Sequence, residues 1–139
     1  MTPPELIAKE NISLIWPLIE PKLLKAMAKM QFIEYDTPYV FDLLSMGDAQ
    51  LWVGGEGEMI AITRIGNYPG VKRLIIDFIG GSNYNDYREH MEYIEHWAIS
   101  LGATEAEAEM RPGLIKTARE EGWSRPRIKM FKKLERGLH

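Results

Sequence analysis

One stretch of the chain decides its fold: Leu74-Ile75-Ile76-Asp77-Phe78-Ile79-Gly80-Gly81. Both alternating faces of this stretch are apolar apart from Asp77, which is typical of a central strand covered on both sides of its sheet. A long helix is predicted directly after it, over 84–101, because apolar and aromatic residues recur there at steps of three and four: Tyr84, Tyr87, Met91, Ile94, Ala98 and Leu101. Residues 104–110 then alternate Glu with Ala and Met, which predicts a strand with one buried face. A strand, a helix and a strand in this order form a right-handed crossover, so the two strands are expected to be parallel.

The segment before the central strand predicts an antiparallel meander. Apolar runs at 50–53 and 59–65 flank the turn Gly54-Gly55-Glu56-Gly57, which is typical of a β-hairpin. A second turn at 66–70 leads into the central strand, which begins at residue 71. The sheet is therefore expected to start with three strands linked by hairpins.

Two helices are predicted ahead of the sheet. Residues 11–29 carry apolar side chains at helical spacing, but Pro17 and Pro21 interrupt them, which predicts a kink or two short helices. Thr37 is predicted to cap the second helix, which has a proline in its first turn and ends at Gly47.

The C-terminal part predicts one more helix and one more strand. The helix covers 112–121, with Pro112 suited to its first position and Gly122 at its end. The last strand is predicted where alternate positions share one face: Ile128, Met130, Lys132 and Leu134. The resulting fold class is α/β, a mixed central sheet with an antiparallel N-terminal meander, a parallel central pair and helices on both faces.

Composition restricts the class of protein. The chain has 139 residues, 45% hydrophobic and 27% charged, as expected for a single globular domain over 1–139. It contains no cysteine, which excludes thiol catalysis, cysteine-ligated zinc and iron–sulfur clusters. The net charge of −3 argues against nucleic-acid binding over the whole surface. The apolar runs are shorter than the ~20 residues of a membrane-spanning helix, and the N-terminus lacks the pattern of a secretion signal. A cytoplasmic protein that does not bind membranes is therefore expected.

Positive charge gathers at the C-terminal end of the chain. Residues 123–139 carry six Lys and Arg side chains and one acidic side chain, Glu135. Such a segment either recruits an anionic partner or forms a solvated last strand and end.

The order of these segments resembles the GNAT superfamily of N-acetyltransferases, most clearly from residue 71 onward. In that family a long central strand leads through a glycine loop into a helix, followed by a strand, a helix, a Gly-aromatic pair and a closing strand. The corresponding stretches here are residues 74–81, 84–101, 105–110 and 112–121, then Gly122-Trp123 and Met130-Phe131-Lys132-Lys133-Leu134. In its overall likeness the chain resembles the small, divergent members that bacteriophages encode, which would place it in the host cytoplasm or in the virion.

The resemblance implies transfer of an acetyl group from acetyl-CoA to an amine on a small molecule or a protein, and it is compatible with a homodimer. Backbone N–H groups at the start of a helix would hold the pyrophosphate of the cofactor. The residues that match this position are Ile79, Gly80, Gly81, Ser82 and Asn83. The family's basic residue and its spaced second glycine are missing there. Arg111, at the end of the next strand, either grips a phosphate or pairs with Glu109 or Glu121.

Asp86 opposes anion binding at the start of this helix. Together with Glu89, three residues on, it has the pattern of a capping box that closes the helix end on itself. Its negative charge also competes with a phosphate for the positive end of the helix dipole.

Asp77 is the candidate general base. A carboxylate among apolar neighbours is costly to bury alone, so it either has a raised pKa and removes a proton from the amine, or it pairs with a basic neighbour such as Arg73. The family's usual acid, a Tyr four residues before the Gly-aromatic pair, is replaced here by Ala118. Three other tyrosines could take that role if the fold brings them close: Tyr68, Tyr84 and Tyr87.

Two functions therefore remain open. The first is an N-acyltransferase with Asp77 as base. The second is a catalytically inactive copy of the fold that serves a phage as an accessory or structural protein through a protein partner. No metal site is expected, because His96 and Glu92 share a helix face but two ligands are too few, and His90 does not align with His96.

Overall fold

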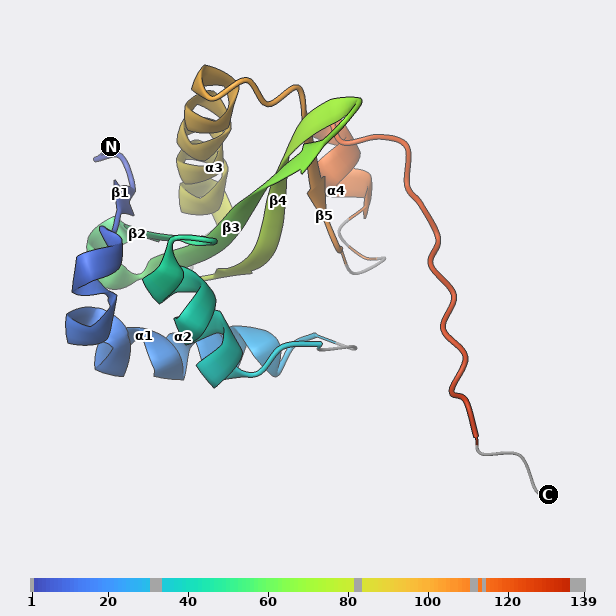
Figure 1. Cartoon of the computed structure of the whole chain (residues 1–139). Coiled ribbons are helices and arrows are strands. Elements are labelled where there is room, and N and C mark those ends of the chain that lie inside the picture. The colour runs from blue at the N-terminus through green and yellow to red at the C-terminus, as the bar shows by residue number, and fades with distance from the viewer. Residues whose placement is uncertain (1, 31–33, 82–83, 111–112, 114, 136–139) are drawn as a thin grey trace. The chain divides into compact units, whose positions relative to one another are not determined.

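Figure 1 shows a computed structural model of the chain. It describes residues 2–30, 34–81, 84–110, 113 and 115–135, and only the backbone at 84–87. Residues 1–109 form one compact unit and residues 110–139 form a second.

The first unit is built on a five-stranded sheet with its strands in chain order. The strands are β1 (Glu5–Leu6), β2 (Gln50–Gly54), β3 (Met59–Tyr68), β4 (Val71–Gly80) and β5 (Glu105–Ala108). The first four pair antiparallel, and β4 pairs parallel with β5. The predicted mixed sheet is therefore confirmed. The sequence missed β1, because two residues are too short to show an alternating pattern.

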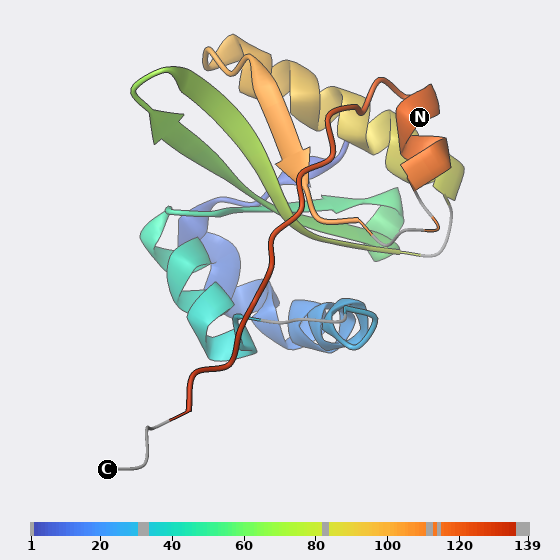
Figure 2. The same cartoon turned by 90° about the vertical axis from the view of Figure 1, so that its right-hand side faces the viewer.

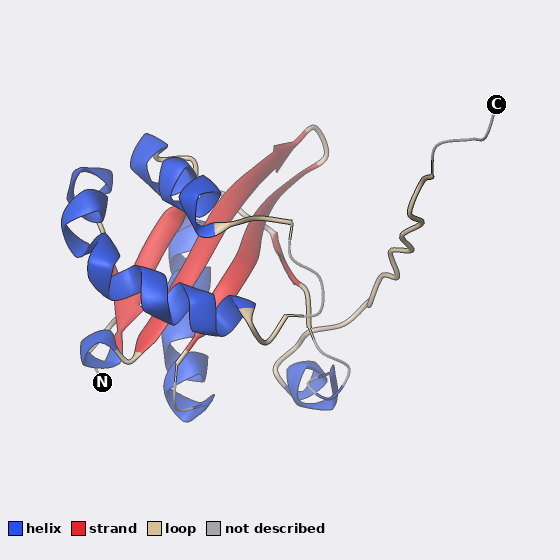
Figure 3. Cartoon of the chain, turned by 90° about the horizontal axis from the view of Figure 1, so that it is seen from below, coloured by secondary structure: helices blue, strands red, loops and turns tan. Residues whose placement is uncertain are grey.

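Helices cover both faces of the sheet, as predicted (Figure 2). The helices α1 (Ile12–Met27) and α2 (Thr37–Met46) pack on one face, where Leu23, Val40 and Ile60 belong to one buried cluster. The helix α3 (Tyr84–Ser100) packs on the other face, where Ile94 joins a second cluster with Trp52. Figure 3 views the sheet from the side of α1 and α2. Two short 3₁₀ turns, η1 (Lys9–Asn11) and η2 (Gly55–Gly57), complete this unit.

The helix α1 is a single element that contains both prolines, so of the two expected alternatives, a kink or two short helices, the second does not occur. Pro17 and Pro21 are exposed. The carbonyl groups whose helical bonds they remove therefore face water, which satisfies them. On the opposite side of the helix, apolar side chains hold it on the sheet: Ile12, Ile19, Leu23 and Met27.

The start of α2 differs from the prediction by one residue. Asp36, not Thr37, is the N-cap, and its carboxylate accepts a hydrogen bond from the backbone N–H of Tyr39. Thr37 is the first helical residue, and its hydroxyl donates to Glu20 of α1 at 2.8 Å. Gly47 ends the helix with a φ of 82°, as predicted.

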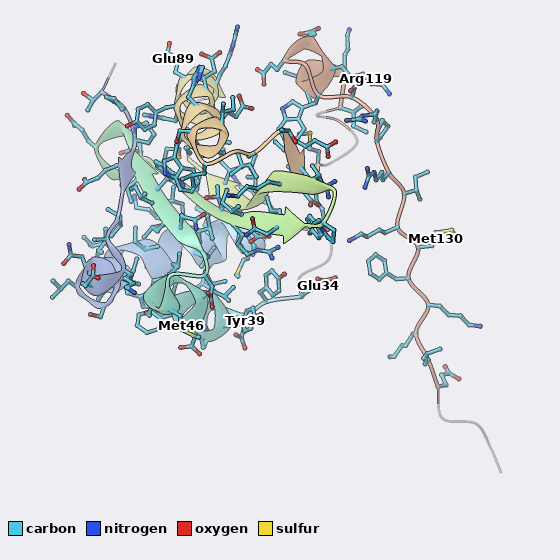
Figure 4. All side chains as sticks on the ribbon, turned by 45° about the horizontal axis from the view of Figure 1, so that its top comes forward. Glu34, Tyr39, Met46, Glu89, Arg119 and Met130 are labelled. Atoms are coloured by element: carbon cyan, nitrogen blue, oxygen red, sulfur yellow. The ribbon has the colours of Figure 1, made fainter. Side chains whose placement is uncertain are left out.

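The second unit contains the helix α4 (Ile115–Glu120) and a C-terminal tail, which we define as residues 124–135. The predicted last strand was wrong, because the tail has no regular secondary structure. Ile128 and Met130 are 90% and 92% exposed, and Met130 projects from the extended ribbon in Figure 4. A strand forms only where a neighbouring strand bonds its backbone, and no strand of the described residues pairs with the tail.

Candidate functional site

The central strand β4 has an irregularity at Asp77. Ile62 of β3 pairs with Phe78, whereas the next residue, Thr63, pairs with Ile76. Asp77 is therefore the extra residue of a β-bulge, a feature that redirects a side chain and often lies beside functional sites. Its position follows from the register between β3 and β4 and not from the alternation within β4.

The carboxylate of Asp77 forms a two-pronged ion pair with Arg64 of β3. Arg64 Nε donates to Asp77 Oδ2 at 2.5 Å, and Arg64 Nη2 donates to Asp77 Oδ1 at 3.0 Å. The Asp77 side chain is 11% exposed and that of Arg64 is 32% exposed. The hydrogen bond to Asp77 raises the pKa of the Arg64 guanidinium, so this side chain keeps its charge.

Arg73, the neighbour considered as the partner of Asp77, is paired elsewhere. Its guanidinium bonds Glu105 of β5 at 2.9 Å and Glu107 at 3.4 Å, and it lies 5.2 Å from the ring centre of Tyr68. Asp77 is therefore paired with a basic side chain, as one of the two interpretations of this residue expected, but that side chain is Arg64 on β3 and not Arg73.

Tyr35 is a site residue that the sequence analysis missed. Its ring packs edge-on against Phe78, the neighbour of Asp77, with ring centres 6.4 Å apart, and stacks on Tyr39 at 5.1 Å. Burial raises the pKa of the Tyr35 phenol, while the charge of Arg64 lowers it and that of Asp77 raises it. The phenol therefore stays protonated beside the Asp77–Arg64 pair. A single Tyr in a connecting segment has no periodicity that would have marked it.

The other tyrosines considered as acids are less well placed or not described. Tyr68 ends β3 at the hairpin with β4, far along the strand from Asp77, and is 49% exposed. The side chains of Tyr84 and Tyr87 lie outside the described residues. Ala118 is buried in α4.

The edge of β4 opens beyond the bulge. The parallel pairing of β4 with β5 ends at Ile76 and Ala108, so the next residues of β4, as far as Gly80, have no strand partner on that side among the residues that the structure describes. Ile79 in this open segment is 38% exposed. A backbone edge without a strand partner can bond an extended ligand that contains amide groups.

The loop after β4 turns sharply into α3. Gly81 has a φ of 154°, which favours glycine, and a Cβ at Gly80 would lie 3.3 Å from the Cβ of Ala26 in α1. Ser82, Asn83 and Arg111 lie outside the described residues.

Asp86 is not the N-cap of α3. The helix begins at Tyr84, so Asp86 is in its first turn and the predicted capping box with Glu89 was wrong. An acidic residue in the first turn of a helix is generally favoured by the helix dipole.

These features fit acetyl-CoA in part. The open edge of β4 suits the amide-containing arm of the cofactor, and the positive end of a long helix after two glycines suits its phosphates. Asp86 and the absence of a basic side chain at Gly80–Gly81 oppose the phosphates.

The structure offers no sign of a metal site in its described part. Among the described residues, no cluster of three or more potential ligands could hold a metal ion. None of the helices in the described ranges is long and apolar enough to cross a membrane.

Comparison with known proteins identifies the architecture through structure and not through sequence. No protein-family profile matches the chain. No curated protein matches it in sequence.

Solved structures match the chain over nearly its whole length. An aminoglycoside acetyltransferase from an uncultured soil metagenomic sample, solved with sisomicin, has a TM-score of 0.70 at 10% identity, covering 95% of both chains. A ribosomal-protein-alanine N-acetyltransferase from Brucella melitensis biovar Abortus 2308 has a TM-score of 0.67 at 12% identity, covering 96% of this chain and all of the other. The aminoglycoside N-acetyltransferase AAC(6')-Iy in complex with CoA has a TM-score of 0.64 at 9% identity, covering 94% and 93%. The chain therefore has the fold of the GNAT N-acetyltransferases.

Proposed function

We propose that the chain is an N-acyltransferase that moves an acetyl group from acetyl-CoA to an amine. The observation that carries this proposal is the open edge of β4 beside the Asp77 bulge, directly before a glycine pair and the start of α3. The similar structures include enzymes named for acetylation of aminoglycosides and of a ribosomal-protein alanine, which supports an amine on a small molecule or a protein as acceptor.

The residues proposed to hold the cofactor follow the open edge. Ile79 and Gly80 would bond the amides of its arm through their backbone, and the loop from Gly81 through Ser82 and Asn83 would face its phosphates, together with Arg111. When bound, acetyl-CoA would supply the thioester that carries the acetyl group.

Asp77 and Tyr35 would handle the protons. The amine nitrogen forms a bond to the acetyl carbon as the carbon–sulfur bond breaks, so the amine must lose one proton and the thiolate must gain one. Each carboxylate oxygen of Asp77 keeps a second lone pair while Arg64 holds the first, so Asp77 can accept the amine proton directly or through water. The leaving thiolate needs an acid that gives it a proton. On the same face of the sheet, the described residues offer the protonated phenol of Tyr35 for this role.

A second candidate function is a catalytically inactive copy of this fold that acts through its surface. The exposed apolar and basic side chains of the C-terminal tail favour it, as does the acidic residue at the proposed phosphate site. In this case the partner would be a protein, the chain would be an accessory or structural protein of a bacteriophage, and it would occur in the host cytoplasm or the virion, with or without homodimer formation.

Acetyl-CoA is expected to stabilise the protein. A ligand present at 100 times its dissociation constant adds about 2.7 kcal/mol to the free energy of unfolding, which raises the melting temperature by several degrees. Differential scanning calorimetry with millimolar acetyl-CoA measures this shift, with acetate at the same ionic strength as control. An unchanged melting temperature would contradict the enzyme and favour the inactive copy.

Removing the charge of Asp86 is expected to tighten cofactor binding. In Asp86→Asn, the first turn of α3 loses a negative charge near the proposed phosphates, so the dissociation constant for acetyl-CoA should fall about two- to fivefold. The same change should cost about 0.3–1 kcal/mol of stability, because a favourable interaction with the helix dipole is lost.

Glu89→Gln is the matched control, since it removes the same charge from an exposed position one turn further along α3, labelled in Figure 4. Isothermal titration of both variants compares the affinities. Weaker acetyl-CoA binding by Asp86→Asn than by Glu89→Gln would show that the phosphates bind elsewhere.

A further inference from the structure

His90 is a buried imidazole without a hydrogen-bond partner. This residue of α3 is 1% exposed, and neither Nδ1 nor Nε2 bonds to any described group. Leaving a buried polar atom without a partner costs about 1–3 kcal/mol, so native structures rarely do so without a functional reason. Among the described residues, this ring therefore has no partner.

Gly54 leaves space for this ring because it has no side chain. A Cβ at Gly54 would lie 2.7 Å from Cε1 and Nε2 of His90 and 3.0 Å from Nδ1. Any larger residue would displace the imidazole, so the end of β2 leaves room for the edge of the ring that carries both nitrogen atoms.

His90 is one of the residues that line a hollow of about 740 Å³. It is lined by Thr2, Pro3, Glu5, Val53, the turn Gly54–Gly57 and His90. This volume is within the range of small-molecule sites. The hollow is separate from the Asp77 site, because His90 belongs to α3 and Asp77 bonds Arg64 on the face of the sheet that α1 and α2 cover.

The lining of the hollow carries negative charge. Glu5 and Glu56 both contribute to it, both are exposed, and no Lys or Arg is among its described lining residues. Neither carboxylate forms an ion pair or a hydrogen bond within the described part of the chain. Glu56 also has a φ of 58°, a left-handed conformation that is strained for a residue with a Cβ and is often retained at binding sites.

The turn already accepts a hydrogen bond from an ammonium group. Lys22 of α1 donates from Nζ to the carbonyl oxygen of Gly57 at 2.5 Å. Lys22 is not among the residues that line the hollow, and its contact shows that the turn presents an oxygen atom to which an ammonium group donates.

We propose that this hollow binds an organic ammonium ion. An ammonium group supplies N–H donors, which an imidazole nitrogen can accept, and its charge complements two carboxylates. An anion would be repelled by both carboxylates, and the described residues offer too few ligands for a metal ion. Binding at this site does not depend on acyl transfer, so a test that fails for one of the two proposals leaves the other unaffected.

Titration with 1,5-diaminopentane at constant ionic strength tests the site. Saturable one-to-one binding is expected, and 1,5-pentanediol, which has the same length without charge, should not bind. The ring ¹⁵N chemical shifts of His90 should move during the titration, whereas those of His96, which is exposed on the same helix, should stay unchanged. A titration that leaves His90 unchanged, or that shows no binding, would overturn the proposal.

Glu56→Gln is expected to weaken the binding about five- to tenfold, because a charge-assisted contact is lost. Asp48→Asn is the matched control, since Asp48 is exposed before the opposite end of β2 and the net charge changes equally. Equal weakening by both variants would mean general attraction to an acidic surface and would overturn the site. Neither substitution touches the core, and no variant of His90 is needed, so loss of folding does not obscure the outcome.

Discussion

Asp77→Asn is expected to lower acyl transfer by about 10²–10⁴-fold, because the amide cannot accept the proton of the amine. The same substitution should lower the free energy of unfolding by about 2–4 kcal/mol. Arg64 would keep its charge in a partly buried position without an ionised partner, and this is the costly way to break such a pair. The two effects are measured separately, by turnover at a temperature where the variant is folded and by urea denaturation.

A second substitution separates the two roles of Asp77. In the double variant Asp77→Asn with Arg64→Met, no charge is left unpaired, so much of the lost stability should return while transfer stays absent. Arg73→Met is the control, because it removes a guanidinium that is partnered by Glu105 at the other end of β4, and it should leave transfer unchanged. Full transfer by Asp77→Asn would contradict the proposed base, and unchanged stability would contradict the structural part of the ion pair.

The architecture was predictable because its long elements carry strong patterns. The apolar run of β4 and the stripe of α3 indicated a central strand and a covering helix, and both were confirmed. The glycine turn at 54–57 likewise indicated the hairpin of β2 and β3. Each of these signals lies within one continuous segment.

The candidate site was less predictable because its geometry comes from contacts between segments. In a regular strand, Arg73 would share a face with Asp77 and was the natural partner. The strand stays in register from Arg73 to Ile76, but each side chain pairs across the sheet and not along β4: Asp77 with Arg64 on β3, and Arg73 with Glu105 on β5. Tyr35 reaches the site from a connecting segment, and no spacing rule connects it with Asp77.

The C-terminal tail shows that a sequence pattern can also predict an element that does not form. Its alternating side chains fit a strand, and local pattern is the only information that the sequence offers there. A strand also needs hydrogen bonds from a neighbour, which the described residues do not give to the tail. Alternation is therefore necessary for a half-buried strand but does not by itself form one.

Leu23→Ala is expected to give the largest loss of stability among the substitutions considered, about 2–5 kcal/mol, which corresponds to a fall of roughly 1–2 M in the urea midpoint. Leu23 is 0% exposed and holds α1, with its two prolines, on the sheet beside Ile19 and Met27. The loss would reach the proposed site, because Ala26 on the next turn of α1 approaches Gly80 at the open end of β4. Leu14→Ala makes the same chemical change in the same helix at a position that is 79% exposed, so it should shift stability by less than about 0.5 kcal/mol. Comparable midpoints for the two variants would show that α1 does not pack on the sheet through the Leu23 face, and the described core would then be wrong at this helix.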